Sequence, residues 1–135
     1  MRIEFWFDFG STYSYPAALR IEQLTAERDL DLQWRPFLLG VIFNRQGIGT
    51  SPFKTHPEME RYMWRDVTRV CNDLSIAFNQ PKRFPQNGLL GARVANHFAG
   101  APWVSAFIRA LFAANFEHDR DIALTETVAD CLKAV

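Results

Sequence analysis

The N-terminal segment alternates between apolar and polar side chains and then breaks at a glycine. The apolar members of this alternation are Ile3, Phe5, Phe7 and Phe9. A period of two, in residue types that favour sheets, predicts a β-strand. Gly10 allows a tight turn, and Pro16 suits the first turn of a helix, where its missing N–H is no loss. The pattern therefore predicts a strand, a turn and a helix whose N-terminus lies near Ser11.

The next segment repeats the strand pattern after a helix. Apolar positions with helical spacing run from Pro16 to Arg28, and the alternation returns from Leu30 to Pro36. A strand that follows a crossover helix is expected to lie parallel to the first, with a right-handed connection. This predicts a β-α-β unit. Two strands alone form a poor sheet, because the outer edges keep unpaired backbone groups.

The rest of the chain indicates a connection followed by helices. Residues 37–49 are apolar and then punctuated by glycine and asparagine, and residues 50–57 indicate a loop. A helix is expected from near Pro57 or Glu58, and its apolar face is formed by Met59, Met63, Val67, Val70 and Leu74. Further helices are predicted over 88–98, over 102–115 and from Thr125, which we expect to cap the last one. The fold class is therefore α/β.

The net charge of the chain indicates which classes of binding partner to expect. The chain has 135 residues, of which 15 are basic and 15 acidic. This balance argues against nucleic acid or an anionic membrane as the main partner, and it suits a small-molecule substrate. The N-terminus passes straight into the strand pattern, without the apolar core of a signal peptide and without a run long enough to span a bilayer. We therefore expect a cytoplasmic protein.

The cysteines and histidines do not suggest a redox or metal site. Cys71 and Cys131 lie far apart on helical patterns, and we expect buried free thiols. Residues 11–14 are Ser-Thr-Tyr-Ser, so a Cys-x-x-Cys motif is absent at the helix start, and disulfide exchange through this position is excluded. The three histidines share no zinc spacing with one another or with either cysteine.

Ser11 is the principal candidate for chemistry. A helix N-terminus carries partial positive charge and unpaired N–H groups, and therefore favours a bound anion or thiolate. Serine is a weak nucleophile without an adjacent base, and the local sequence offers none. We therefore interpret Ser11 as a hydrogen-bond donor to the sulfur or oxygen of a ligand. The alternative is that Ser11 or Ser14 serves only as the N-cap of the helix.

Four motifs in order resemble one family. They are FWFDFGSTYSY at 5–15, WRPFLLG at 34–40, YMWRD at 62–66 and FPQNGL at 84–89. Together they resemble the bacterial 2-hydroxychromene-2-carboxylate isomerases, relatives of kappa-class glutathione transferases and of DsbA-type oxidoreductases. The resemblance implies a thioredoxin-like β-α-β start in residues 1–40 and a helical insertion domain in residues 41–135. It also implies that the C-terminal half of the thioredoxin sheet is missing from this chain.

The resemblance implies a cofactor and a set of site residues. The cofactor is glutathione, whose thiolate would accept a hydrogen bond from Ser11 and act as the nucleophile in the isomerisation. The positions that would contact the substrate are Asn44 or its neighbour Phe43, Phe53, Lys54 and Phe84. Only Lys54 among them is a cation for a substrate carboxylate, and Phe84 lacks a phenol hydroxyl.

The residues are also compatible with two other functions. The first is a kappa-type transferase or peroxidase, which would use Ser11 and the thiolate with another acceptor. The second is a shortened, inactive binding module, in which the exposed sheet edge pairs with a second copy of the chain to form a homodimer. Incubation with an electrophilic acceptor and with the chromene acid separates the two enzymes, and light scattering tests the dimer.

Overall fold

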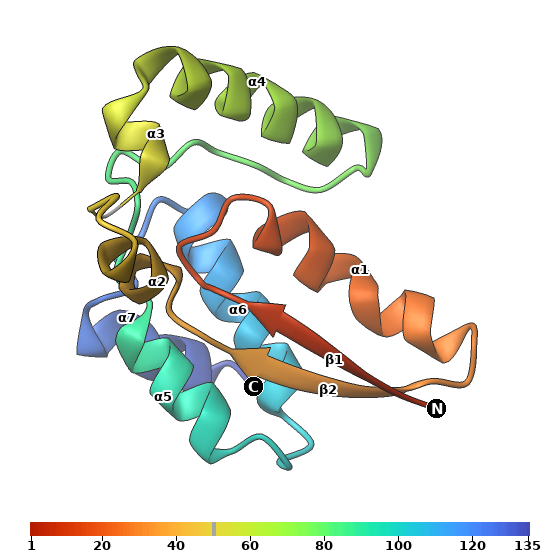
Figure 1. The fold of residues 1–135 in the computed structure, drawn as a ribbon. Coiled ribbons are helices and arrows are strands. Elements are labelled where there is room, and N and C mark those ends of the chain that lie inside the picture. The colour runs from red at the N-terminus through yellow and green to blue at the C-terminus, as the bar shows by residue number, and fades with distance from the viewer. Residues whose placement is uncertain (50) are drawn as a thin grey trace.

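The computed structural model describes residues 1–49 and 51–135, and its elements follow the chain in the order drawn in Figure 1. The elements are β1 (Arg2–Phe7), α1 (Ser14–Ala26), β2 (Asp31–Pro36), α2 (Leu39–Arg45), α3 (Pro52–Thr55), α4 (Pro57–Asp73), α5 (Leu89–His97), α6 (Val104–Phe116) and α7 (Thr125–Lys133).

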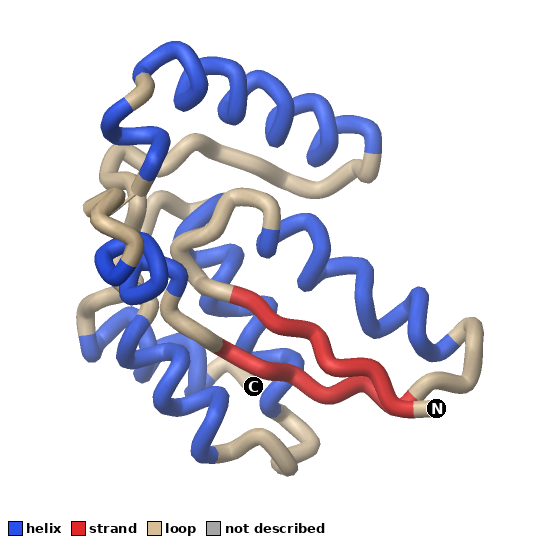
Figure 2. The backbone as a smooth tube through the Cα atoms, viewed as in Figure 1, coloured by secondary structure: helices blue, strands red, loops and turns tan. Residues whose placement is uncertain are grey.

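The predicted β-α-β unit is confirmed. Strands β1 and β2 pair in parallel, with Phe5 opposite Trp34 and Phe7 opposite Pro36. Figure 2 shows the two strands side by side, with α1 running along them. The parallel pairing follows from the crossover helix, which returns the chain to the same end of the sheet. Within the described residues, this pair is the whole sheet.

Helices α5 and α6 complete the body around the sheet. Helix α6 contacts α1, α5 and α7, and α5 contacts β2. Helix α4 lies apart from the sheet in Figure 1, and the extended segment that follows it runs back beside it. Phe78 of this segment stacks between Trp64 of α4 and Phe116 of α6, and Asn79 N–H donates to the Phe116 carbonyl. The segment thereby joins α4 to the body.

Aromatic side chains of the core meet where β1 ends. Phe9 packs on Phe7 and Phe112 with ring centroids 5.2 and 5.0 Å apart. Phe7 and Phe9 are almost fully buried and Phe5 is partly buried, so the apolar positions of the alternation face the core as predicted. Asn115 of α6 donates to the Phe9 carbonyl at 3.0 Å, which satisfies a backbone group just beyond the strand. The end of β1 is therefore fixed by packing and by a hydrogen bond from α6.

The structure differs from the sequence prediction between the sheet and α4. Residues 37–49 contain the short helix α2, and the predicted loop contains α3, whose N-cap Ser51 accepts from Phe53 N–H at 3.3 Å. Thr50, the first residue of that predicted loop, lies outside the described residues. Helix α4 begins at Pro57 as predicted, but Met59 is 49% exposed and was wrongly assigned to the apolar face. Thr125 is the first residue of α7 and makes no side-chain cap bond, so that prediction was also wrong.

Candidate functional site

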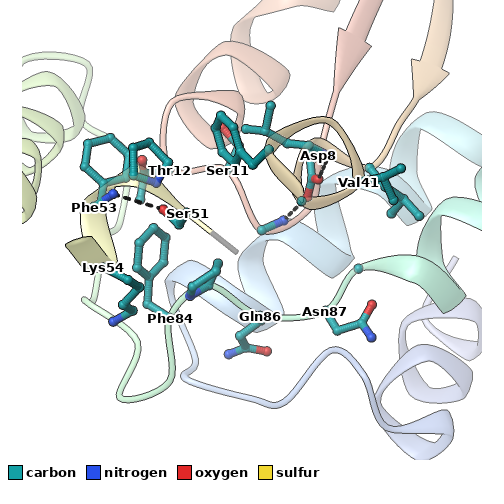
Figure 3. A pocket seen from close by; sticks show the side chains of 18 of the residues that line it. Asp8, Ser11, Thr12, Val41, Ser51, Phe53, Lys54, Phe84, Gln86 and Asn87 are labelled. Carbon is teal, nitrogen blue, oxygen red and sulfur yellow. Dashed lines mark hydrogen bonds between the residues drawn. The ribbon is translucent and has the colours of Figure 1, made fainter. Parts of the chain in front are cut away.

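The turn between β1 and α1 is closed by hydrogen bonds to Asp8. Gly10 N–H donates to Asp8 Oδ1 at 2.7 Å, and Ser11 N–H donates to the Asp8 carbonyl at 3.0 Å. Gly10 is required here, because a β-carbon at this position would lie 2.6 Å from the Gln86 carbonyl oxygen. The turn leaves Ser11 half-buried just ahead of Ser14, where α1 begins. Figure 3 shows Ser11 among the residues that line a pocket.

The hydroxyl of Ser11 has a proton available for a ligand. Its oxygen accepts a long hydrogen bond of 3.4 Å from Ser14 N–H, and Tyr13 occupies the N-cap position without a side-chain cap bond. Neither serine is therefore the N-cap residue. Among the described residues, the Ser11 hydroxyl donates no hydrogen bond. The first turn of α1 itself holds no acidic side chain that would oppose the positive end of the helix dipole.

Ser11 faces a cavity of about 1020 Å³. Its walls come from the turn after β1, from α2, from α3 and from the loop before α5. Every site residue predicted from the sequence lines it, namely Ser11, Asn44, Phe53, Lys54 and Phe84. Phe43, the alternative to Asn44, lines it as well. The structure thus brings residues from four separate segments to one cavity large enough for a small peptide and an aromatic acid together.

The wall opposite the turn is aromatic and carries a cation. The ring of Phe84 packs edge-on against Trp64 at 4.8 Å and lies 6.4 Å from the ring of Phe53. The Lys54 ammonium lies 5.5 Å from the centre of the Phe84 ring and 3.3 Å from Glu60 Oε1. Because the lysine side chain is 43% exposed, this ion pair is screened by water and leaves donors for a ligand carboxylate.

Asp8 is a cavity residue that sequence reasoning missed. The residue is only 9% exposed, and its two side-chain oxygens accept from Gly10 N–H and Leu39 N–H, each at 2.7 Å (Figure 3). Burial raises the pKa of the Asp8 carboxyl, and the bonds from Leu39 and Gly10 oppose that shift. A polar residue in a strand alternation usually faces solvent. The glycine two residues later was the only local signal that Asp8 instead closes a turn.

Gln86 is a second cavity residue that was missed. It is buried, and its side-chain Oε1 accepts from Ile122 N–H at 2.8 Å, so its amide oxygen holds the segment before α7. The preceding Phe84–Pro85 peptide bond is cis. The backbone of Gln86 approaches Gly10, which brings the loop before α5 against the turn that carries Ser11.

The described residues form no metal site, disulfide or membrane-spanning helix. The part of the chain that the structure describes contains no cluster of three or more histidine, cysteine, aspartate or glutamate side chains able to hold a metal ion. Both cysteines are free and buried, as expected. Across the same residues, no helix has the length and apolarity needed to cross a membrane.

The chain is similar to known proteins in sequence and in fold. The model of the DSBA-like thioredoxin domain matches residues 2–135. A comparison with curated protein sequences found no match. A solved structure of 2-hydroxychromene-2-carboxylate isomerase superposes with a TM-score of 0.83 over 99% of this chain, at 20% sequence identity. This chain spans 65% of that isomerase chain, and at this identity the likeness shows a shared fold. The chain therefore belongs to the family of DSBA-like thioredoxin domains and has the thioredoxin-like α/β fold.

Proposed function

We propose that this protein binds glutathione with its sulfur at Ser11 and isomerises 2-hydroxychromene-2-carboxylate or a similar aromatic ring-cleavage product. The observation that carries the proposal is a serine hydroxyl with a free proton, ahead of a helix N-terminus, on the wall of a large and mainly apolar cavity. The similar fold of 2-hydroxychromene-2-carboxylate isomerase supports it.

The residues of the turn fit a bound thiolate. Ser11 would donate its hydroxyl proton to the sulfur, and the positive end of α1 would favour the anionic form. A hydrogen bond to a charged group contributes about 1.5–3 kcal/mol. When bound, glutathione would supply the nucleophilic thiolate that adds to the conjugated substrate and leaves again. The share of the protein is then to hold the two molecules in reacting geometry and to stabilise negative charge.

The opposite wall fits an aromatic acid. The rings of Phe53 and Phe84 offer apolar surface to a flat bicyclic substrate, and the Lys54 ammonium beside Phe84 would bind its carboxylate. Asn44 lines the same cavity from α2 and adds an amide that both donates and accepts. Lys54 also pairs with Glu60, so the carboxylates of Glu60 and of the bound substrate would both contact the Lys54 ammonium.

The test is turnover of the chromene acid with glutathione, followed by loss of substrate absorbance and by chromatography of the product. We expect isomerisation that requires glutathione, is lost in Ser11→Ala and has a raised KM in Lys54→Met. Lys82→Met is the matched control, because that lysine is 93% exposed and pairs with Asp119 away from the cavity. Conjugation of an electrophilic acceptor without isomerisation would instead assign a kappa-type transferase, and no reaction with either compound would contradict both.

A further inference from the structure

We propose that Asp8 is a positioning residue, whose buried carboxylate holds α2 against the turn of Ser11 and thereby sets the cavity wall that an acceptor molecule contacts. The role in the reaction depends on the proposed function, whereas the attachment of α2 does not. The two oxygens of the carboxylate accept from different parts of the chain. Oδ1 accepts from Gly10 N–H in the turn, and Oδ2 accepts from Leu39 N–H at the start of α2.

Helix α2 has few other attachments. None of its residues is buried, and Val41 and Ile42 are 47% and 42% exposed. Within the described residues, the bond from Leu39 N–H to Asp8 is the one hydrogen bond that joins residues 39–45 to a part of the chain outside 38–48. A helix of this length is marginal without tertiary support. The position of α2 therefore depends heavily on one carboxylate oxygen.

The same helix forms part of the cavity wall. Val41, Phe43 and Asn44 line the cavity together with Asp8, and Figure 3 labels Val41 and Asp8 among its lining residues. Displacement of α2 would therefore move the surface that contacts the acceptor, while Ser11 and the start of α1 keep their own hydrogen bonds. The carboxylate suits this task better than an amide, because both of its oxygens accept and an amide offers only one acceptor.

A proline at position 39 separates the bond to α2 from the bond to the turn. Leu39 is the first helical residue of α2, where proline is well tolerated, and Leu38 before it is extended with φ −117° and ψ 101°, as a residue before proline must be. Leu39→Pro removes the N–H donor to Asp8 and leaves the bond from Gly10 intact. Leu39→Ala is the matched control, since it also removes the leucine side chain but keeps the N–H.

Hydrogen exchange of the ligand-free protein tests the attachment. We expect amides of residues 41–45 to exchange about tenfold faster in Leu39→Pro than in Leu39→Ala, because a hydrogen bond to a charged group is lost. Amides of α4 serve as the internal reference and should not change. Asp8→Ala is the second variant; it removes both acceptor oxygens and should give the same local acceleration. Equal exchange in α2 of Leu39→Pro and Leu39→Ala would overturn the proposal.

Kinetics tests the role in the reaction. At saturating glutathione, Leu39→Pro should raise the KM for the chromene acid several-fold relative to Leu39→Ala, with an unchanged Kd for glutathione. If the bond only stabilised the fold, Leu39→Pro would lower the fraction of active protein and therefore kcat, and KM would stay the same. That result would overturn the positioning role. If the wild-type chain binds no glutathione, the proposed function fails, and the exchange experiment still decides whether Asp8 holds α2.

Discussion

Substitution of Gly10 by alanine is predicted to destabilise the protein and to weaken its ligand site together. The added β-carbon would lie 2.6 Å from the Gln86 carbonyl oxygen and 3.3 Å from Asp8 Oδ1. The φ angle of Gly10 is outside the left-handed region, so alanine can adopt the backbone conformation and the cost comes from the contact alone. A carbon and a carbonyl oxygen in contact lie roughly 3.3–3.6 Å apart, so the two backbones must separate by about 0.7 Å or more.

The size of the effect follows from this overlap. The obstructing atom belongs to the backbone and cannot rotate away, and overpacking of this kind costs about 1–3 kcal/mol. For a domain of this size the melting temperature should fall by about 4–12 °C. Because the displaced turn carries Ser11, the affinity for glutathione should fall in the same variant.

Urea denaturation and calorimetric titration of glutathione measure the two effects. Gly100→Ala is the matched control, because a β-carbon at Gly100 has no neighbour within 4 Å and its φ is also outside the left-handed region. That variant should match the wild-type chain in both measurements. A Gly10→Ala protein as stable as Gly100→Ala would refute the close approach of the turn to Gln86.

Three further predictions follow from buried groups. Phe112→Ala should lower the free energy of unfolding by about 3–5 kcal/mol in urea denaturation, since the Phe112 ring is fully buried against Phe9. Phe98→Ala is the control and should lower it far less, because Phe98 is 43% exposed. Similar losses in both variants would show that the core is misplaced. Burial raises the pKa of the Cys71 and Cys131 thiols, so both should resist a thiol reagent in the native protein and react on unfolding, and rapid native labelling would contradict this. Burial also raises the pKa of Asp8 above 3.8, so the folded chain binds that proton more tightly than the unfolded chain. The stabilising contribution of Asp8 is then complete below pH 3.8 and is lost as the pH rises through the raised pKa. Urea denaturation from about pH 4 to 7 should therefore show the wild-type chain losing stability relative to Asp8→Asn. Parallel pH profiles of the two proteins would exclude the pKa shift.

The sequence predicts the elements whose signals are local. The alternation that ends at Phe9, together with Gly10, identifies β1 and its turn, and the longer helices have several turns of apolar spacing. Helices α2 and α3 were missed because segments of 7 and 4 residues are too short to establish a period. Their positions depend on tertiary hydrogen bonds and capping rather than on an apolar face.

Five residues of the candidate site were predicted from the sequence, one from local helix signals and four from the family resemblance. Ser11 follows from the helix start, whereas Asn44, Phe53, Lys54 and Phe84 were named through a family resemblance, and the structure places all five on one cavity. Asp8 could not be recognised as a buried carboxylate, because the donor that binds Oδ2 is Leu39, which lies 31 residues away in the sequence. Such a contact exists only after the chain has folded.

Calorimetric titration of glutathione into the wild-type chain, Ser11→Ala and Ser14→Ala tests the central claim most directly. Ser14 is the matched control, because it lies in the same helix start but does not line the cavity. The account predicts saturable binding that weakens about tenfold or more in Ser11→Ala and is retained in Ser14→Ala, in line with the loss of a hydrogen bond to a thiolate. Equal affinities in all three proteins, or no binding to a folded wild-type chain, would contradict a glutathione site at Ser11.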